Sequence, residues 1–547
     1  MAASGEGKSA TGASGAANAG GAPVQRWGSR IGVILAVSGS AVGIGNYLRF
    51  PGLAAQYGGG AFMIPYFCAL LFLAMPVGWA EWSMARYGGR KGFHSAPGIM
   101  GVVGKGRLAR YLGSLGVLIS LIAFMYYILV EAWCLRYAWE YLVGSYDLGA
   151  DPSAYAQRSM DVFNAYVGMS RDGALLSGGV SATVVFWVIV FLLNLGLILR
   201  GLQGGIEKFC SYALPTMAIL SIVVLVRVLT LGTPDPSHPE LNVVTGLGYM
   251  WNPDFSKLGD FTTWLAAAGQ IFFTLSVGFG VILNYASYLR KKDDVVLSGL
   301  TAAAANEVSE VGFGGLITIP ASYVFLGSTM VIGSTFALGF NTLPVVFEHM
   351  GSAGRAVGFS WFFLLFLAAV ASSISMLQPA KAFFEEALGL SHRRSTLMTG
   401  ALCAVGSLWV IWFSQDATAM ATMDFWVGNF AIFVFATVQI ICFGWVFGVD
   451  RGLEEAHHGA LMRIPRIFRF IMKYVAPLYL LIVLVGFCWQ NLPASARSLA
   501  ESPVAVETLL LVAGLLVLLL VLVRVGERRW RAAGMDLDGE RPPEDDE

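Results

Sequence analysis

The stretch GSAVGIGNYLRFP, residues 39–51, lies inside an apolar run that extends from about residue 31 to about residue 55. A bilayer core about 30 Å thick requires about 20 apolar residues from a helix that crosses it, and this run is long enough. The stretch at 39–51 nevertheless contains three glycines, a proline, Asn46 and Arg49. Two of the glycines have the GxxxG spacing of packed membrane helices, but packing does not explain Asn46 or Arg49. We therefore expect an interrupted membrane helix whose break lines a binding site.

The composition of the whole chain is that of a membrane protein. Of its 547 residues, 56% are hydrophobic and 13% are charged, and the mean hydropathy is +0.66, whereas soluble domains carry about 25% charge. The net charge is zero, so nothing in the composition favours nucleic acid as a partner. An all-α polytopic fold with twelve transmembrane helices is predicted, because twelve apolar runs are long enough to cross a membrane. The runs lie at approximately 31–55, 62–85, 111–143, 182–200, 209–231, 261–289, 296–328, 357–387, 397–414, 424–449, 466–490 and 505–525.

The sixth run contains a second interruption. The stretch GQIFFTLSVGFG, residues 269–280, is rich in glycine and carries Thr274 and Ser276 near its middle. Unwinding frees backbone carbonyls to coordinate a hard cation and frees backbone amides to hold a carboxylate. Two interrupted helices, five apart in chain order, are typical of transporters built from two repeats.

The distribution of charge predicts how the chain is oriented and divided. Lysine and arginine concentrate in the loops after even-numbered helices, which is typical of cytoplasmic loops. We therefore predict a multi-pass protein of the inner membrane with both termini in the cytoplasm. The predicted divisions are a disordered tail at 1–24, a ten-helix core at 25–450, helices 11 and 12 at 451–528, and a disordered acidic tail at 529–547.

Further polar residues lie at membrane depth, where an ionisable group is a functional hypothesis by default. Glu81 and Glu131 are equally compatible with a structural role, in which each carboxyl is buried and hydrogen-bonded. The full set is Glu81, Glu131, Asn306, Glu307, Glu310, Gln378 and Asp424.

Nine motifs follow one another along residues 27–450: GSAVGIGNYLRFP, GGGAFMIPY, EWSMARYGG, MYYILVEAW, GLQGGIEKFC, GQIFFTLSVGFG, TAAAANEVSEVGFGG, ASSISMLQP and MDFWVGNF. In order and spacing they resemble the neurotransmitter:sodium symporters, specifically the bacterial members that transport amino acids. The resemblance implies two inverted repeats of five helices, helices 1–5 and 6–10, with broken helices 1 and 6 at the centre.

The resemblance implies a first sodium site made of the Ala41 carbonyl and the side chains of Asn46, Thr274 and Asn306. The carboxylate of the substrate would complete the shell. This donor set suits the ion, because a hard cation prefers oxygen ligands.

A second sodium site is implied at the carbonyls of Gly39, Val42 and Ala368, together with a hydroxyl of helix 8. Family members usually have two adjacent ligating side chains there, whereas this chain has Ala371 followed by Ser372. One ligand is therefore missing, and the number of bound sodium ions, one or two, stays open.

The implied substrate lies between the two broken helices, with its carboxylate on backbone amides of helix 1 and its amine on carbonyls of helices 1 and 6. Gly43 and its neighbours leave no carboxylate where amine-transporting members have one, which favours an amino acid over an amine. A small residue at 123 and a methionine at 376 favour leucine, methionine or an aromatic amino acid. The implied substrate-binding residues are Ala41, Ile44, Gly45, Ala123, Tyr127, Phe273, Thr274, Ser276, Phe279, Ser373 and Met376.

Two gates are implied on opposite sides of this site. Phe273 and Tyr127 would form a lid beneath an outer ion pair. The arginine that usually precedes the inner gate is replaced by Val24, and Arg26 is the alternative partner. The implied gate residues are Arg49 and Asp424 on the outer side, and Trp27, Tyr288, Gln378 and Glu386 on the inner side.

Glu310 stands where chloride-dependent relatives lack an acid. A carboxylate at this position supplies the negative charge itself, which implies chloride independence and allows proton antiport during the return step.

We therefore predict a sodium-coupled symporter that imports a neutral, apolar L-amino acid by alternating access. The alternatives are a transporter-like amino-acid sensor, and a symporter for another small zwitterion coupled to one sodium ion or to a proton. No nucleophile–base or catalytic metal constellation suggests an enzyme. The expected partners are the amino acid, the lipid bilayer and sodium, and a homodimer through helices 11 and 12 stays open.

Overall fold

The structure is a computed structural model that describes residues 25–177, 179, 181–327 and 335–541. The predicted tail at 1–24, which includes Val24, lies outside the described residues, and so do residues 542–547. Every regular element in the described ranges is helical, as the sequence predicts.

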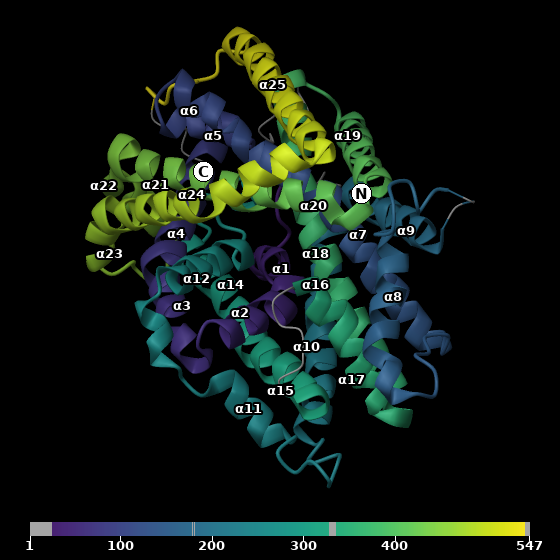
Figure 1. Cartoon of the computed structure of the whole chain (residues 1–547). Helices are drawn as coiled ribbons and strands as arrows, with labels where there is room; N and C mark the ends of the chain where they lie inside the picture. The colour runs from purple at the N-terminus through teal and green to yellow at the C-terminus, as the bar shows by residue number, and fades with distance from the viewer. Residues whose placement is uncertain (1–24, 178, 180, 328–334, 542–547) are drawn as a thin grey trace, which may run out of the picture.

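The described residues form twenty-five α-helices, which Figure 1 colours from purple near the N-terminus to yellow at the C-terminus. The first ten are α1 Arg30–Ala41, α2 Phe50–Gln56, α3 Met63–Ala69, α4 Met75–Gly89, α5 Ala96–Val103, α6 Arg107–Leu112, α7 Ser114–Val143, α8 Tyr155–Val167, α9 Ala182–Leu199 and α10 Lys208–Leu229. The next eight are α11 Val243–Trp251, α12 Phe261–Thr274, α13 Val281–Ala286, α14 Val295–Glu307, α15 Gly315–Leu326, α16 Thr335–Ala337, α17 Leu343–His349 and α18 Gly354–Leu388. The last seven are α19 His392–Trp412, α20 Thr418–Met423, α21 Ile432–Ile441, α22 Val449–His457, α23 Ile467–Phe470, α24 Ala476–Glu501 and α25 Pro503–Ala532.

Several consecutive helices are joined by short π-helical turns and continue one another as a single span. Such turns are common where a helix carries a functional site. The turns between two helices are Leu70–Ala74, Val308–Gly314, Leu338–Thr342, Asp424–Ala431, Cys442–Gly448 and Ile471–Val475. Two further π-helical turns begin a span: Gly45–Arg49 leads into α2 after the first break, and Leu202–Glu207 leads into α10.

Ten helical spans among the described residues are long and apolar enough to cross a membrane, and a bent pair provides an eleventh. That pair is Arg30–Ala41 and Gly45–Gln56, which meet at 49°. The remaining predicted span, 261–289, is divided between α12, which has 14 residues, and α13, which has 6. Neither piece is long enough by itself to cross a bilayer, so the predicted interruption of the sixth helix explains the difference from twelve.

The two ends of the bundle carry different short helices. Figure 1 shows α8, α11 and α17 at one end, and α5, α6 and the last turns of α25 at the other. We call these the α11 end and the α5 end.

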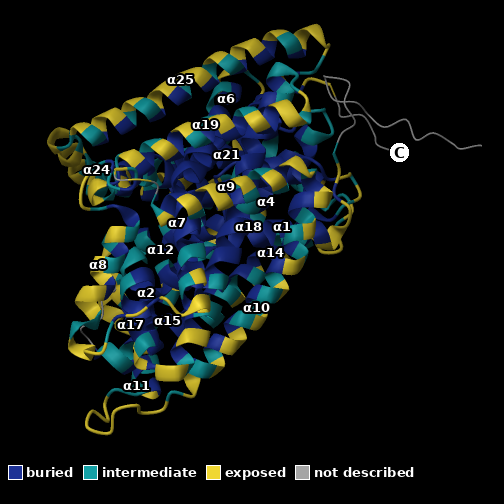
Figure 2. Cartoon of the chain, turned by 90° about the vertical axis from the view of Figure 1, so that its right-hand side faces the viewer, coloured by how far each residue is buried: buried dark blue, intermediate teal, exposed yellow. Residues whose placement is uncertain are grey.

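The centre of the bundle is formed by α7 and α18, and α24 and α25 lie at its edge (Figure 2). In the most apolar part of the span that contains α7, 94% of the residues are buried, and in that of α18, 83% are buried. The corresponding values are 39% for α24 and 22% for α25. The broken helices therefore pack against a rigid central pair, while the last two helices present apolar side chains outward.

The chain after residue 528 is more ordered than predicted. Helix α25 continues to Ala532, and the carboxylates that follow find cations at the α5 end. Lys91 Nζ lies 2.5 Å from Asp536 Oδ2, and Arg110 Nη2 lies 2.8 Å from Asp538 Oδ1. The prediction of a disordered tail therefore does not hold for residues 529–541, because ion pairs with buried cations offset the cost of ordering them.

Candidate functional site

The two helix breaks lie side by side at the centre of the molecule. Helix α1 ends at Ala41, and the side-chain Oδ1 of Asn46 accepts the backbone N–H of Gly43 at 2.7 Å, which satisfies one amide freed by the break. The second break follows Thr274, and Gly278 and Gly280 have φ angles of 80° and 82° there. A Cβ atom on Gly280 would lie 2.7 Å from the Gly116 carbonyl oxygen, so this turn requires glycine for both conformation and space.

Three predicted sodium ligands meet between the breaks, together with Glu310. The Asn46 Nδ2 lies 3.0 Å from Thr274 Oγ1, 2.8 Å from Asn306 Oδ1 and 3.2 Å from Glu310 Oε2. Thr274 Oγ1 in turn donates to Glu310 Oε2 at 2.5 Å. Gln270 Nε2 donates to the other carboxylate oxygen at 2.6 Å. All five side chains are buried.

This cluster has the chemistry of a cation site. A hydroxyl, an amide oxygen and a carboxylate oxygen converge on one point, which the amide nitrogen of Asn46 occupies. Such oxygens are the ligands that a hard cation prefers. A half-turn of the Asn46 amide would present its oxygen to the same point, and it would exchange the hydrogen bond from the Gly43 N–H for a bond to the cation. The donor set therefore fits sodium.

The predicted second sodium site is only partly assembled. Ser372 Oγ lies 3.5 Å from the Gly39 carbonyl and 3.3 Å from the Ser40 carbonyl. Helix α1 therefore supplies a carbonyl, that of Ser40, which the sequence did not indicate. Ala368 and Ala371 are fully buried beside Ser372 on the same helix, and Ala371 offers no oxygen where a second side-chain ligand is expected.

Glycine at two positions of the first break allows large side chains to approach the backbone. A Cβ on Gly43 would lie 3.1 Å from Ser372 Oγ and 3.3 Å from Tyr127 Oη. A Cβ on Gly45 would lie 2.8 Å from the Phe273 ring. The predicted lid residues therefore do lie over the predicted amide groups, although their roles toward a substrate stay predictions.

Two predicted substrate contacts have other partners in this conformation. Ser276 has a φ of 53°, a strained value for a non-glycine residue, and its hydroxyl donates to the Ser40 carbonyl at 3.1 Å. Ser373 Oγ lies 2.6 Å from Glu131 Oε2 and 2.8 Å from Asn194 Oδ1. The Ser373 hydroxyl thus faces α7 and α9 in this conformation, and its contact with a substrate stays a prediction. Ala123 and Phe279 are buried, and Met376 is partly buried.

The predicted outer gate pair is separated. The Arg49 guanidinium lies 4.7 Å from the centre of the Phe273 ring, a cation–π contact. Asp424 Oδ1 accepts the Tyr126 hydroxyl at 2.8 Å, and its Oδ2 accepts Asn429 Nδ2 at 3.0 Å. Among the described residues no direct Arg49–Asp424 ion pair is present, since each side chain is bound by a nearer aromatic or amide group.

On the α5 end, the predicted inner gate is packed shut. Trp27 Nε1 donates to the Tyr285 carbonyl at 2.9 Å, and its ring meets the Tyr285 ring edge-on. Tyr288 stacks on His94 with ring centres 4.5 Å apart. Gln378 is buried on α18.

Glu386, the remaining inner-gate residue, binds the N-terminus of α5. Its carboxylate accepts the backbone N–H groups of His94 and Ser95, at 2.5 and 3.0 Å, and the Ser95 hydroxyl at 2.7 Å. Arg26 is exposed, and Arg30 pairs with Asp294 at 3.2 Å. The N-terminus of α5 therefore uses the Glu386 carboxylate, and the role of Arg26 as the alternative partner in the inner gate stays a prediction.

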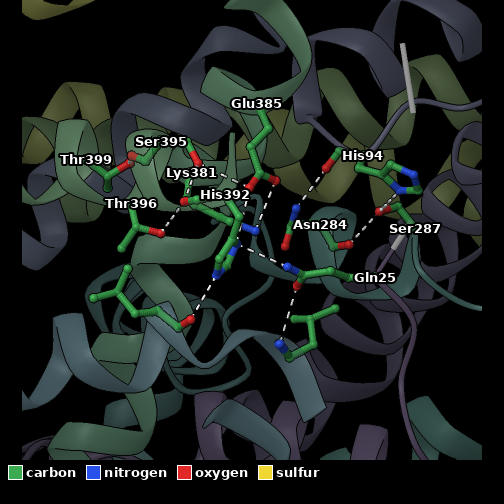
Figure 3. Close-up of polar contacts among 12 residues, drawn as sticks. Gln25, His94, Asn284, Ser287, Lys381, Glu385, His392, Ser395, Thr396 and Thr399 are labelled. Atoms are coloured by element: carbon green, nitrogen blue, oxygen red, sulfur yellow. Dashed lines mark hydrogen bonds and ion pairs between the residues drawn. The ribbon is translucent and has the colours of Figure 1, made fainter. Parts of the chain in front are cut away.

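Residues around His392 tie the start of the described chain to α18 (Figure 3). His392 Nδ1 lies 3.1 Å from Gln25 Nε2 and 3.3 Å from Glu385 Oε1. Lys381 Nζ lies 3.0 Å from the other oxygen of Glu385. These polar contacts hold the N-terminal segment on α18 and α19, in addition to the packing of the Trp27 ring.

The burial of His94, in the loop between α4 and α5, predicts acid sensitivity. Burial lowers its pKa from 6.5 to about 4, although Glu385 opposes the shift; Lys381 adds to it, and Glu386 binds the backbone of His94. The unfolded state therefore binds more protons between these pH values, and up to about 3 kcal/mol of stability is lost as the pH falls from 6.5 to 4. We expect the melting temperature of the purified protein to fall over this range, and to fall less in His94→Gln.

The matched control is His238→Gln, which changes an exposed histidine at the opposite end. It should leave the acid response of the melting temperature unchanged. An equal response in wild type and His94→Gln would contradict the role of His94.

Three groups around the breaks and the outer gate could hardly be identified from the sequence. Glu81 Oε1 accepts the Gly278 N–H at 3.1 Å and Gln439 Nε2 at 2.6 Å, so it supports the second break. Its depth in the membrane made it a candidate, but nothing indicated its partner. The Ser40 carbonyl and Tyr126 carry no signal, because only the path of the backbone brings them to Ser372 and Asp424.

Comparison with known proteins agrees with this geometry. The family model described as the sodium:neurotransmitter symporter family matches residues 24–147 and 151–530. The chain belongs to this family. As in the sequence-based prediction, this symporter therefore has a sodium-dependent transporter's fold, built around two interrupted helices.

Relatives of this symporter include proteins named as amino-acid transporters. An uncharacterized sodium-dependent transporter of Methanocaldococcus jannaschii is 28% identical over 460 residues, which cover 83% of this chain and 89% of that protein. Sodium-dependent nutrient amino acid transporter 1 of Drosophila yakuba is 23% identical over 513 residues, 84% of this chain and 77% of that protein. The crystal structure of MhsT in complex with L-phenylalanine has a TM-score of 0.71 at 24% identity, over 84% of this chain and 99% of that one. This last likeness shows a shared fold.

Proposed function

We propose that this protein imports a neutral, apolar L-amino acid together with sodium, by alternating access around the two breaks. The observation that carries the proposal is the cluster between the two breaks, in which oxygens of Thr274, Asn306 and Glu310 converge on the Asn46 amide. A cation bound there neutralises the carboxylate of a substrate held by the same breaks. Substrate and ion would then stabilise each other, which is the physical basis of coupling.

An amino acid fits the site better than an amine. No acidic side chain stands at Gly43 or its neighbours in the first break, so a substrate must bring its own carboxylate to complete the cation shell. Ala123 and Phe279 provide buried apolar surface. The names of the Drosophila transporter and of the MhsT complex with L-phenylalanine support an amino-acid substrate.

Chloride independence follows from Glu310. Its two oxygens accept hydrogen bonds from Gln270, Thr274 and Asn306, so when a cation is bound beside it the carboxylate supplies the negative charge that an anion would otherwise supply. We place the protein in the inner membrane with both termini in the cytoplasm, on the basis of its loop charges.

One sodium ion is enough to drive uptake even if the second site is weak. A tenfold gradient contributes about 1.4 kcal/mol per ion, and a membrane potential of 100 mV adds about 2.3 kcal/mol per charge. Together these correspond to more than a hundredfold accumulation.

The proposal is tested by thermal stabilisation of the purified protein with each of the twenty amino acids, in sodium and then in potassium. A ligand that binds the folded state raises its stability by mass action. We expect a few apolar amino acids to raise the melting temperature in sodium only. Stabilisation that is equal in potassium, or absent with all twenty, would refute the proposal.

Ala371→Thr should strengthen sodium binding. A Cβ on Gly39 would lie 3.3 Å from Ala371 Cβ, so a hydroxyl at residue 371 would face the carbonyls of α1 beside Ser372. One added hydrogen-bond-like ligand contributes about 0.5–1.5 kcal/mol, so we expect roughly two- to tenfold tighter sodium binding. The measurement is the sodium dependence of amino-acid binding.

Ser372→Ala is the opposing control, because it removes the remaining hydroxyl and should weaken sodium binding. No change in either variant would mean that this site does not bind the ion.

A further inference from the structure

A buried carboxyl outside the proposed sodium site has an unusual set of partners. Glu131 on α7, Asn194 on α9 and Ser373 on α18 are each fully buried and in mutual contact. Asn194 Nδ2 lies 2.9 Å from Glu131 Oε1, and Ser373 Oγ lies 2.6 Å from Glu131 Oε2. Ser373 Oγ also lies 2.8 Å from Asn194 Oδ1, which closes a ring of three side chains.

The orientation of the Asn194 amide is decided by its surroundings. Its Nδ2 lies 2.9 Å from Glu131 Oε1 and 2.9 Å from the Val190 carbonyl, and both of these oxygens are acceptors. The reversed amide would place an oxygen against two acceptors. Asn194 Oδ1 must therefore be the atom that faces Ser373, and it can only accept a hydrogen bond.

Counting protons shows that an ionised Glu131 cannot satisfy the ring. Ser373 Oγ has one proton but three neighbouring acceptors, which are Glu131 Oε2, Asn194 Oδ1 and the Val370 carbonyl at 3.1 Å. With a carboxylate at 131, either Glu131 Oε2 or Asn194 Oδ1 loses its donor, and an unsatisfied buried acceptor is costly. With a proton on Glu131 Oε2, that oxygen donates to Ser373, and Ser373 donates to Asn194.

The charges around Glu131 agree with the neutral form. No ion pair to Glu131 exists among residues 25–177, 179, 181–327 and 335–541. Its titratable neighbours are Tyr127 and Cys134 on its own helix, and these groups are neutral at ordinary pH; α9 and α18 face it with Asn194 and Ser373. An unpaired carboxylate at this depth in a membrane would be expensive.

We propose that Glu131 is a proton-binding site, and that the protonated carboxyl positions Ser373 in the centre of the bundle. Ser373 follows Ser372, whose hydroxyl lies near the Gly39 and Ser40 carbonyls of the first break. The bound proton thereby holds this turn of α18 against α7 and α9, and it sets the orientation of the helix that faces the second ion site. Glu131 is a positioning residue, and the proton stays with the protein as a structural ligand. The step through the ion site rests on the proposed function, whereas the protonation itself does not.

The test compares Glu131→Gln, Glu131→Ala and wild type by infrared difference spectroscopy and melting temperature at neutral pH. A glutamine amide donates to Ser373 and its oxygen accepts from Asn194, so Glu131→Gln reproduces the protonated ring. We expect it to lose one carbonyl band of a protonated carboxylic acid, while keeping the melting temperature and sodium dependence of wild type. Glu131→Ala should lose the same band and several degrees of melting temperature.

Glu507→Gln is the matched control, since Glu507 is exposed on α25 and should contribute no such band. The proposal is overturned if Glu131→Gln lacks a difference band, or if it is destabilised as much as Glu131→Ala. If Glu131→Gln does not fold, Ser373→Ala gives a second reading, because the acid loses its acceptor and its band must shift or disappear. An unchanged band in Ser373→Ala also overturns the proposal.

If amino-acid binding to the wild-type protein does not depend on sodium, the proposed function is refuted, but the infrared result on Glu131 is unaffected. The two failures are therefore distinguishable.

Discussion

Asn306→Ala should strongly weaken sodium-dependent binding of the amino acid and leave a folded protein. Asn306 Oδ1 is one of the three oxygens that converge between the breaks, at 2.8 Å from Asn46 Nδ2 and 3.0 Å from Thr274 Oγ1. An interaction with a charged group is worth about 1.5–3 kcal/mol, which corresponds to roughly 10- to 150-fold weaker sodium binding. Because the ion and the substrate carboxylate stabilise each other, amino-acid binding should weaken with it.

The measurement is a titration of amino-acid binding with sodium at constant ionic strength. Asn491→Ala is the matched control, because Asn491 lies on α24 at the edge of the bundle and hydrogen-bonds its own helix at the Phe487 carbonyl. It should leave the sodium titration unchanged. Retained sodium dependence in Asn306→Ala would show that this cluster does not bind the ion.

Glu310→Ser should convert the protein from chloride independence to chloride dependence. The substitution removes the carboxylate and leaves hydrogen-bond donors on Gln270, Thr274 and Asn306 directed at the space that it occupied. These donors then lack an acceptor, and the cation site lacks its neighbouring negative charge. We expect sodium-dependent binding to fall at least about tenfold in gluconate and to recover when chloride is supplied.

Glu307→Gln provides the comparison for this variant. Glu307 precedes Glu310 by three residues and also lies beside Asn306, but its carboxylate accepts the Tyr66 hydroxyl at 2.9 Å, so this variant removes a neighbouring negative charge and leaves the Glu310 carboxylate in place. This variant should bind amino acid equally well in gluconate and chloride. If Glu310→Ser also binds equally well in both salts, the negative charge at residue 310 does not replace an anion.

The sequence was informative wherever a residue violated the rules of an apolar helix. Asn46 and the glycines around it indicated the first break, and Thr274 and Ser276 indicated the second. The resemblance then named Asn306 as a ligand, and the structure brings these residues together although Asn46 and Asn306 are 260 positions apart. The resemblance did not name the backbone carbonyl of Ser40, which lies 3.3 Å from Ser372 Oγ.

Hydroxyl and carboxylate partners were the least predictable features. Ser373 was expected in the substrate pocket, but its hydroxyl faces Glu131 and Asn194. Glu386 was named as an inner-gate residue, and the sequence did not indicate that its carboxylate binds the start of α5. A short polar side chain forms a hydrogen bond only with a group about 3 Å away, and a sequence pattern does not predict positions to that precision.

Composition, helix length and the polar interruptions of helices 1 and 6 were enough to determine a polytopic helical membrane protein with two interrupted helices at its centre. They suffice because a bilayer penalises every unsatisfied backbone group and every unpaired charge, so departures from an apolar helix are few and informative. Only the tertiary structure decided that Arg49 lies over Phe273 and not on Asp424, that Glu81 supports the second break, and that Glu131 shares a ring with Ser373. Those contacts join helices that are far apart in the chain, and their geometry depends on how the helices pack against one another.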